Sequence, residues 1–424
     1  MGPLLPRPEP AKKPRLLLND RSSKARACGR NGLVKRGINL VLAAFALTAL
    51  SYGLARFAYG LLLPQIRQDL ALSVSAAGWI GGSAFAAYCV GIVATIVCSG
   101  KVSPRGLTVM AGAAAALGMG LIVLASSGLT LGCGVALAGL STGLTSPPLA
   151  SAVAARLDDA DRPRANGFIN AGTAAGIVFS GLAAILAAGQ WRQLYALFAL
   201  IGIGVTIWLW FAVPRRVERD VAQNFSLAML RRPGVLPLCA SAFLMGLAST
   251  AIWTFGADIL RSEAGFSDQS IAWAWIVLGA AGISGCMTGV FTGRFGVVRI
   301  QHLALAGIAL GTLGLSAASI SAGSGLVAMC LFGAAYIVSS GVYLLQGIRL
   351  FADRPDLGLG IPFLVLALGQ TAGTPVFGAV LEATGVTFAL CVFAAAACAA
   401  MVLCPRDGES PRGQMCQSTE GLGR

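Results

Sequence analysis

Long runs of apolar residues alternate with short polar segments from residue 38 to near the end of the chain. A bilayer core about 30 Å thick is spanned by roughly 20 apolar residues in helical form. Because open strands leave backbone groups unpaired in lipid, these runs are predicted to be helices. The pattern predicts twelve spans with the following approximate bounds: 38–64, 76–99, 106–126, 129–155, 165–189, 191–213, 234–260, 270–292, 298–320, 325–350, 357–381 and 385–404.

Composition supports the same class. Of the 424 residues, 56% are hydrophobic and only 11% are charged, whereas a soluble domain carries roughly 25% charged residues to cover its surface. A soluble enzyme, a nucleic-acid-binding protein and a disordered chain are therefore excluded, and we expect an all-α polytopic membrane protein whose surroundings are the lipid bilayer.

The positions of the basic residues predict the orientation. With a cytoplasmic N-terminus, 27 of the 31 Lys and Arg residues fall on the inner side, while three (Arg67, Arg192 and Arg261) fall on the outer side. This asymmetry predicts a multi-pass protein of the cell (inner) membrane with both termini cytoplasmic. Residues 1–36 hold ten of these cations, which predicts a disordered basic tail on the cytoplasmic side. A second cytoplasmic tail is predicted at 405–424.

An internal repeat divides the chain into two halves. A shift of 194 positions places Arg67 on Arg261, Ser73 on Ser267 and Trp79 on Trp273. With small changes of offset, further matches follow: Asp161-Arg162-Pro163 with Asp353-Arg354-Pro355, and Gly172, Gly176 and Gly181 with Gly369, Gly373 and Gly378. The repeat predicts two parallel six-helix halves, 37–213 and 234–404, joined by a cytoplasmic linker at 214–233.

These features resemble the major facilitator superfamily, whose twelve helices form two parallel halves. The resemblance extends to a bacterial branch of largely uncharacterised permeases and rests on these segments: Gly53-Leu54-Ala55-Arg56-Phe57-Ala58-Tyr59, Leu62-Leu63-Pro64, Trp191-Arg192, Gly172-Thr173-Ala174-Ala175-Gly176 and Gly369-Gln370. It implies a secondary transporter, acting as a monomer on a small-molecule substrate, with no enzymatic activity. The loop 100–105 lacks the family's acidic residue, and the fourth span lacks the arginine of many drug:proton antiporters.

Arg56 is the main candidate for substrate binding. It lies eight residues before Pro64, about 12 Å below the outer end of the first helix at 1.5 Å per residue. A charge at that depth is costly unless it faces a wet cavity or a partner. Tyr52 and Tyr59 lie four residues before and three after it, which predicts one shared helical face. A guanidinium suits a carboxylate or phosphate, although a structural arginine is the alternative.

Other polar residues in apolar spans complete the candidate site. In the tenth span they form a stripe at helical spacing, which predicts either lining of the cavity or hydrogen bonding between helices. Asp258 is a candidate for carrying a coupling proton, and the sequence allows it to pair with Arg56. The substrate-binding candidates beside Arg56, Tyr52 and Tyr59 are Asn170, Trp253, Tyr336, Ser340, Tyr343, Gln346 and Gln370.

Metal and cofactor chemistry receives no support from the sequence. His302 is the only histidine, and the eleven cysteines include no CxxC pair, so we expect no metal site and no cofactor. The leading hypothesis is a secondary active transporter for a small organic anion. An efflux permease for a neutral or lipophilic compound is a second, and a transport-inactive membrane receptor or scaffold is a third.

Overall fold

The structure is a computed structural model that describes residues 37–98, 101–158, 160–187, 189–215, 231–351 and 355–405. The predicted tail at 1–36, most of the linker at 214–233 and all but the first residue of the tail at 405–424 lie outside the described residues. Within them the chain is almost entirely helical, as the apolar runs predict.

Eleven described helices are long and apolar enough to cross a membrane, and the 17-residue α16 (Val386–Val402) is a shorter apolar helix. Each coincides with one predicted span, which confirms the twelve-helix fold class. The first half contains Gly37–Leu70, which includes η1 (Ala49–Phe57) and α2 (Ala58–Leu70), then α3 (Val74–Val97), α4 (Pro104–Val123), α5 (Gly128–Gly143), α6 (Ser146–Ala154), α7 (Arg162–Ala187) and α8 (Trp191–Ala212). The second half contains α9 (Val235–Trp253), α10 (Gly256–Ala264), α11 (Asp268–Ala281), η3 (Gly282–Met287), α12 (Thr288–Phe295), α13 (Val297–Gly314), η4 (Leu315–Ser319), α14 (Ala322–Leu350), α15 (Pro355–Thr384) and α16.

The helix ends repeat between the halves at the predicted shift of 194 positions. Ser73 and its repeat Ser267 both accept a hydrogen bond from a backbone N–H in the first turn of α3 and α11. Ala71 and Gly265 occupy the same left-handed position after α2 and α10, with φ of 49° and 63°. Because a side chain disfavours that conformation, glycine is the better residue there. The same local signals therefore start and stop equivalent helices in both halves.

The repeated glycines let backbones approach closely in equivalent ways. A Cβ atom at Gly176 would lie 2.4 Å from the carbonyl oxygen of Ala49 in the first helix. A Cβ atom at Gly373 would lie 2.9 Å from Leu247, which is 198 positions after Ala49. In lipid the hydrophobic effect does not drive helices together, and small residues instead allow the close van der Waals packing that does. The glycine pattern is thus a packing motif of both halves.

Several spans are interrupted. The first helix takes a π-helical form over η1, and the seventh span breaks at Thr254–Phe255 between α9 and α10. The fourth span breaks at Leu144–Thr145, where the prolines that follow enter the first turn of α6 without losing a helical hydrogen bond. By contrast, α15 continues as one helix through its two internal prolines, Pro362 and Pro375.

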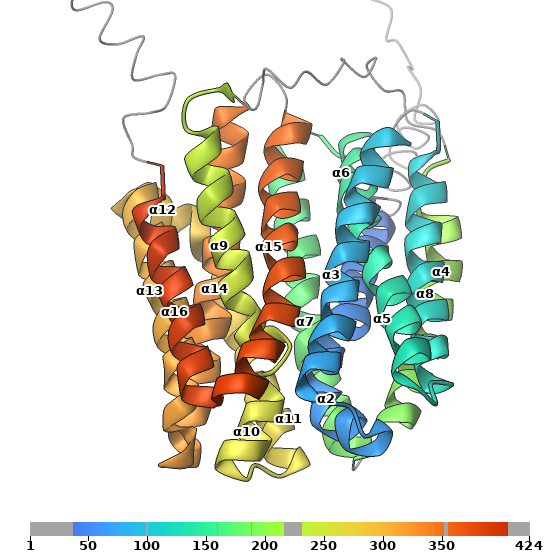
Figure 1. Cartoon of the computed structure of the whole chain (residues 1–424). Helices are drawn as coiled ribbons and strands as arrows, with labels where there is room; N and C mark the ends of the chain where they lie inside the picture. The colour runs from blue at the N-terminus through green and yellow to red at the C-terminus, as the bar shows by residue number, and fades with distance from the viewer. Residues whose placement is uncertain are drawn as a thin grey trace, which may run out of the picture.

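The halves meet through α3 with α15, α7 with α11, and α2 with α10. Figure 1 shows α2 and α10 together at one end of the bundle and α6 at the opposite end. At the α2/α10 end, Arg67 forms an ion pair with Asp258, and the backbone N–H of Ser75 donates to Glu382 at 2.8 Å. This end, predicted to be the outer one, is closed by direct contact between the halves.

Candidate functional site

Arg56 lies in the π-helical segment of the first span and is only 5% exposed. Its guanidinium donates to Oε1 of Gln370 in α15, so the contact joins the two halves. Among the described residues, no carboxylate lies within ion-pair distance of Arg56, and its Nε has no hydrogen-bond partner. The centre of the protein therefore holds a buried cation without a neutralising anion in the part of the chain that the structure describes.

Aromatic rings surround this cation. The ring centroids of Tyr88, Phe85, Phe57 and Tyr52 lie 4.5, 4.6, 4.8 and 5.9 Å from its Cζ atom. Cation–π attraction offsets part of the cost of burial. It leaves the net charge in place, because a ring offers a quadrupole rather than a negative charge.

Gln370 is fully buried and organises the side of the site contributed by the second half. Its Nε2 donates to the Ser249 hydroxyl at 3.1 Å and to the Tyr336 hydroxyl at 3.2 Å. These two acceptors fix the amide so that its carbonyl oxygen faces Arg56. Residues of η1, α9, α14 and α15 are thereby joined in one polar network.

Trp253 packs beside this network. It stacks on Phe57 with ring centroids 3.9 Å apart and meets Tyr336 edge-on at 5.0 Å. Phe332 and Trp275 complete the cluster at 5.6 and 6.0 Å. The indole N–H of Trp253 is buried without a described partner, so an unused hydrogen-bond donor lies within a few ångströms of the rings.

The structure separates the two predicted tyrosine neighbours of Arg56. Tyr52 is half-buried, and its hydroxyl shares a 3.0 Å hydrogen bond with the exposed Ser146 of α6. Tyr59 instead donates to the carbonyl of Ala77 in α3. A π-helix turns less per residue than an α-helix, so the spacing that predicts one shared face does not hold across η1.

The polar stripe of α14 divides between the two interpretations. Tyr336 belongs to the Arg56 network, and Ser340 donates to the carbonyl of Tyr336 within its own helix. Tyr343 of α14 bonds the Ser241 hydroxyl of α9 at 2.7 Å, and Gln346 contacts Cys404 just after α16, so both join parts of the second half. Asn170 is exposed on α7 and makes no hydrogen bond to the Arg56 network within the described residues.

Asp258 pairs with Arg67, which corrects the expectation that it pairs with Arg56. The reason is the break after Trp253: α10 carries Asp258 against α2, beyond the depth of Arg56. Substrate binding at Arg56 cannot displace this carboxylate directly. A role for Asp258 in proton coupling stays a prediction.

Sequence reasoning missed Phe85, Tyr88, Ser249 and Ser146 as members of the site. Tyr88 offered a signal, since it is a polar aromatic residue inside an apolar run. The others resemble ordinary core or packing residues. Taken together, the site offers cationic and amide donors, hydroxyl groups and aromatic faces, which suit recognition of a small solute, and no described cluster suits a metal ion.

A family model described as the Major Facilitator Superfamily matches residues 45–361. The purine ribonucleoside efflux pump NepI of Shigella sonnei (strain Ss046) is 26% identical over 212 residues, covering 46% of this chain and 50% of that protein. The protein of the same name from Escherichia coli (strain K12) is 25% identical over the same coverage. The chain thus spans about half the length of the curated relatives it matches.

Solved structures share the fold. The nucleoside transporter NupG has a TM-score of 0.71 and 13% identity, with 87% of this chain and 98% of that chain covered. A D-xylose-proton symporter has a TM-score of 0.70 and 16% identity, with 87% and 96% covered. A bacterial homolog of the human lysosomal transporter Spinster, in an inward-facing and occupied conformation, has a TM-score of 0.69 and 15% identity, with 86% and 95% covered. At these identities the similarity shows the fold alone.

Proposed function

We propose that this chain, which belongs to the Major Facilitator Superfamily, is a secondary active transporter that moves a small organic anion by alternating access. The family and the apolar helices make it a multi-pass membrane transport protein rather than an enzyme. The observation that supports an anionic substrate is Arg56, a buried guanidinium with no described carboxylate partner.

The physical argument concerns the charge. A buried ion is costly unless it is paired and hydrogen-bonded, and Gln370 supplies only a neutral amide oxygen. A carboxylate or phosphate would neutralise Arg56 and accept from the Nε that now lacks a partner. The planar guanidinium of an arginine binds such groups through two parallel hydrogen bonds.

The geometry also supports alternating access. Arg56 and Gln370 come from different halves, so their contact changes when the halves rock against each other. The α2/α10 end is closed by the Arg67–Asp258 pair, whereas α6, at the other end, packs chiefly within its own half. We therefore expect a solute to approach the site from the α6 end, where Ser146, the hydrogen-bond partner of Tyr52, is exposed.

A second candidate substrate is a neutral purine nucleoside or similar ring compound, moved outward. Two observations favour it: the matched relatives are named purine ribonucleoside efflux pumps, and aromatic side chains gather around Arg56 and Trp253, as suits contact with a flat ring. The indole N–H of Trp253 would then donate to a ring or sugar oxygen.

A ligand screen with the purified protein tests both candidates. The unfolding midpoint is measured with small mono- and dicarboxylates, phosphate esters, purine nucleosides and sugars, since a ligand of the folded state raises it by mass action. We expect an anion to stabilise the wild type. Arg56→Gln should weaken that binding about 10- to 150-fold, because a hydrogen bond to a charged group contributes about 1.5–3 kcal/mol.

Two further variants control the test. Arg56→Lys keeps the charge but lacks the fork, so it should recover little affinity. Arg192→Gln removes an arginine that pairs with Asp69 away from the site and should bind normally. Stabilisation by nucleosides alone, unchanged in Arg56→Gln, would refute the anion and leave the second candidate.

A further inference from the structure

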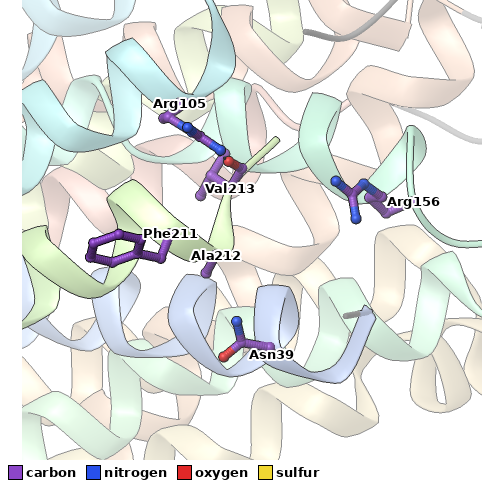
Figure 2. Close-up of a pocket in the computed structure, with 6 residues that line it drawn as sticks. All are labelled: Asn39, Arg105, Arg156, Phe211, Ala212 and Val213. Atoms are coloured by element: carbon purple, nitrogen blue, oxygen red, sulfur yellow. Dashed lines mark hydrogen bonds between the residues drawn. The ribbon is translucent and has the colours of Figure 1, made fainter. Parts of the chain in front are cut away.

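A separate basic pocket lies in the first half, away from the Arg56 network. It encloses about 230 Å³ and is lined by residues from the ends of four helical spans: Asn39, Arg105, Arg156, Phe211, Ala212 and Val213. Figure 2 shows the polar ends of Asn39, Arg105 and Arg156 arranged around the same space. No carboxylate lines it, so the pocket carries two positive charges without an opposing one in its lining.

Its polar groups have hydrogen-bonding capacity to spare. Arg105 uses Nε to donate to the Val213 carbonyl at 2.7 Å, which orients the guanidinium and leaves its two terminal nitrogens without a described partner. The side chain of Arg156 has no described hydrogen bond or ion pair and is exposed. Asn39 accepts from the Trp208 indole, so its amide N–H groups remain free to donate. Donors from three spans thus converge on one small volume.

Aromatic residues place this pocket at the level of lipid headgroups. Trp208, Trp210 and Phe211 occupy the last turns of α8, and Trp210 and Phe211 are 55% and 75% exposed. Tryptophan and other aromatic residues gather where a membrane helix meets the headgroup region. Below them, the packed pair α4 and α8 exposes apolar side chains, including Leu117 and Ile207, which would face acyl chains.

We propose that this basic pocket binds the phosphate of an anionic phospholipid, with its acyl chains along α4 and α8. Basic pockets between helices at this depth recognise anionic headgroups. Arg105 and Arg156 supply charge-assisted hydrogen bonds to the phosphate oxygens, and Asn39 supplies a neutral donor. Phe211 lies where a lipid reaching the pocket would pass.

Native mass spectrometry of the purified full chain, delipidated in a neutral detergent, tests the proposal. The dissociation constant of the first dioleoylphosphatidylglycerol bound is compared with that of dioleoylphosphatidylcholine. We expect tighter binding of the anionic lipid and about a 25-fold loss in Arg105→Gln/Arg156→Gln, since each arginine contributes about fivefold. The matched control Arg299→Gln/Arg349→Gln removes two exposed arginines of the second half and should bind as the wild type does.

Arg156→Gln alone guards against misfolding, because it removes no described contact, and it should weaken binding about fivefold. Equal affinity in the wild type and Arg156→Gln, or an equal loss in the control pair, would overturn the proposal. Full competition by millimolar inorganic phosphate or glycerol 3-phosphate would also overturn it, because the pocket would then be a site for soluble phosphate.

Discussion

Gly60 tests whether contact between the halves holds the α2/α10 end closed. A Cβ atom at Gly60 would lie 1.9 Å from the carbonyl oxygen of Trp253 and 3.2 Å from the Trp275 ring, both in the other half. The carbonyl oxygen of Trp253 belongs to the backbone, so it cannot move away from the added methyl group without moving the helix. Gly60 has helical backbone angles, and alanine there is compatible with α2 and favours the helix by about 0.5–1 kcal/mol. Gly60→Ala should therefore disfavour only the closed arrangement.

The size of the effect follows from overpacking, which costs about 1–3 kcal/mol for an inserted methyl group that the surroundings cannot accommodate. That cost lowers the population of the closed form relative to the open one by about 5- to 150-fold. Electron–electron distance measurements report it directly. With spin labels at the exposed positions Gln68 and Ser262, the distance between the labels should lengthen. With labels at Arg164 and Arg349, near the other end, the distance between them should shorten.

Two glycine variants serve as controls. Gly204→Ala adds a methyl group in open space on α8 and should leave both distance distributions unchanged. Gly246→Ala clashes with the carbonyl of Leu366 inside the second half, at 2.1 Å, so it should lower stability without opening the α2/α10 end. Unchanged distances in folded Gly60→Ala would refute the reasoning, as would an equal shift in Gly204→Ala.

Other variants test single features. Ala71→Gly should raise the free energy of unfolding by about 1 kcal/mol, because Ala71 is left-handed where the repeat has glycine; a lowered melting temperature would contradict this. Tyr343→Phe should lower stability by about 1 kcal/mol through the lost hydrogen bond and leave the transport KM unchanged, whereas a raised KM would favour cavity lining. Asp258→Asn in proteoliposomes should keep solute exchange and lose accumulation driven by a pH gradient; retained accumulation would exclude a coupling role. A cysteine at Glu263, in a cysteine-free background, should be labelled only from outside, and labelling from the cytoplasm would reverse the orientation.

The sequence by itself determined the elements and their repetition. Apolar length fixes a spanning helix because lipid leaves no other way to satisfy backbone groups, so all twelve predicted runs coincide with helices. The caps at Ser73 and Ser267, and the left-handed positions at Ala71 and Gly265, act within a few residues of themselves. Such local signals can be read from the sequence because they do not depend on how the rest of the chain packs.

Only the tertiary structure decided which residues meet. Arg56 and Gln370 are 314 positions apart, and their contact depends on the rotation of two helices from different halves. The π-helical turn of η1 directed Tyr52 and Tyr59 to different partners, and the break after Trp253 placed Asp258 beside Arg67. Shifting a helix by one turn along its axis, or rotating it by a few tens of degrees, would exchange such partners while the hydrophobic pattern of the sequence stays the same. Pairing within the site therefore follows from helix packing, which apolar runs and repeats leave open.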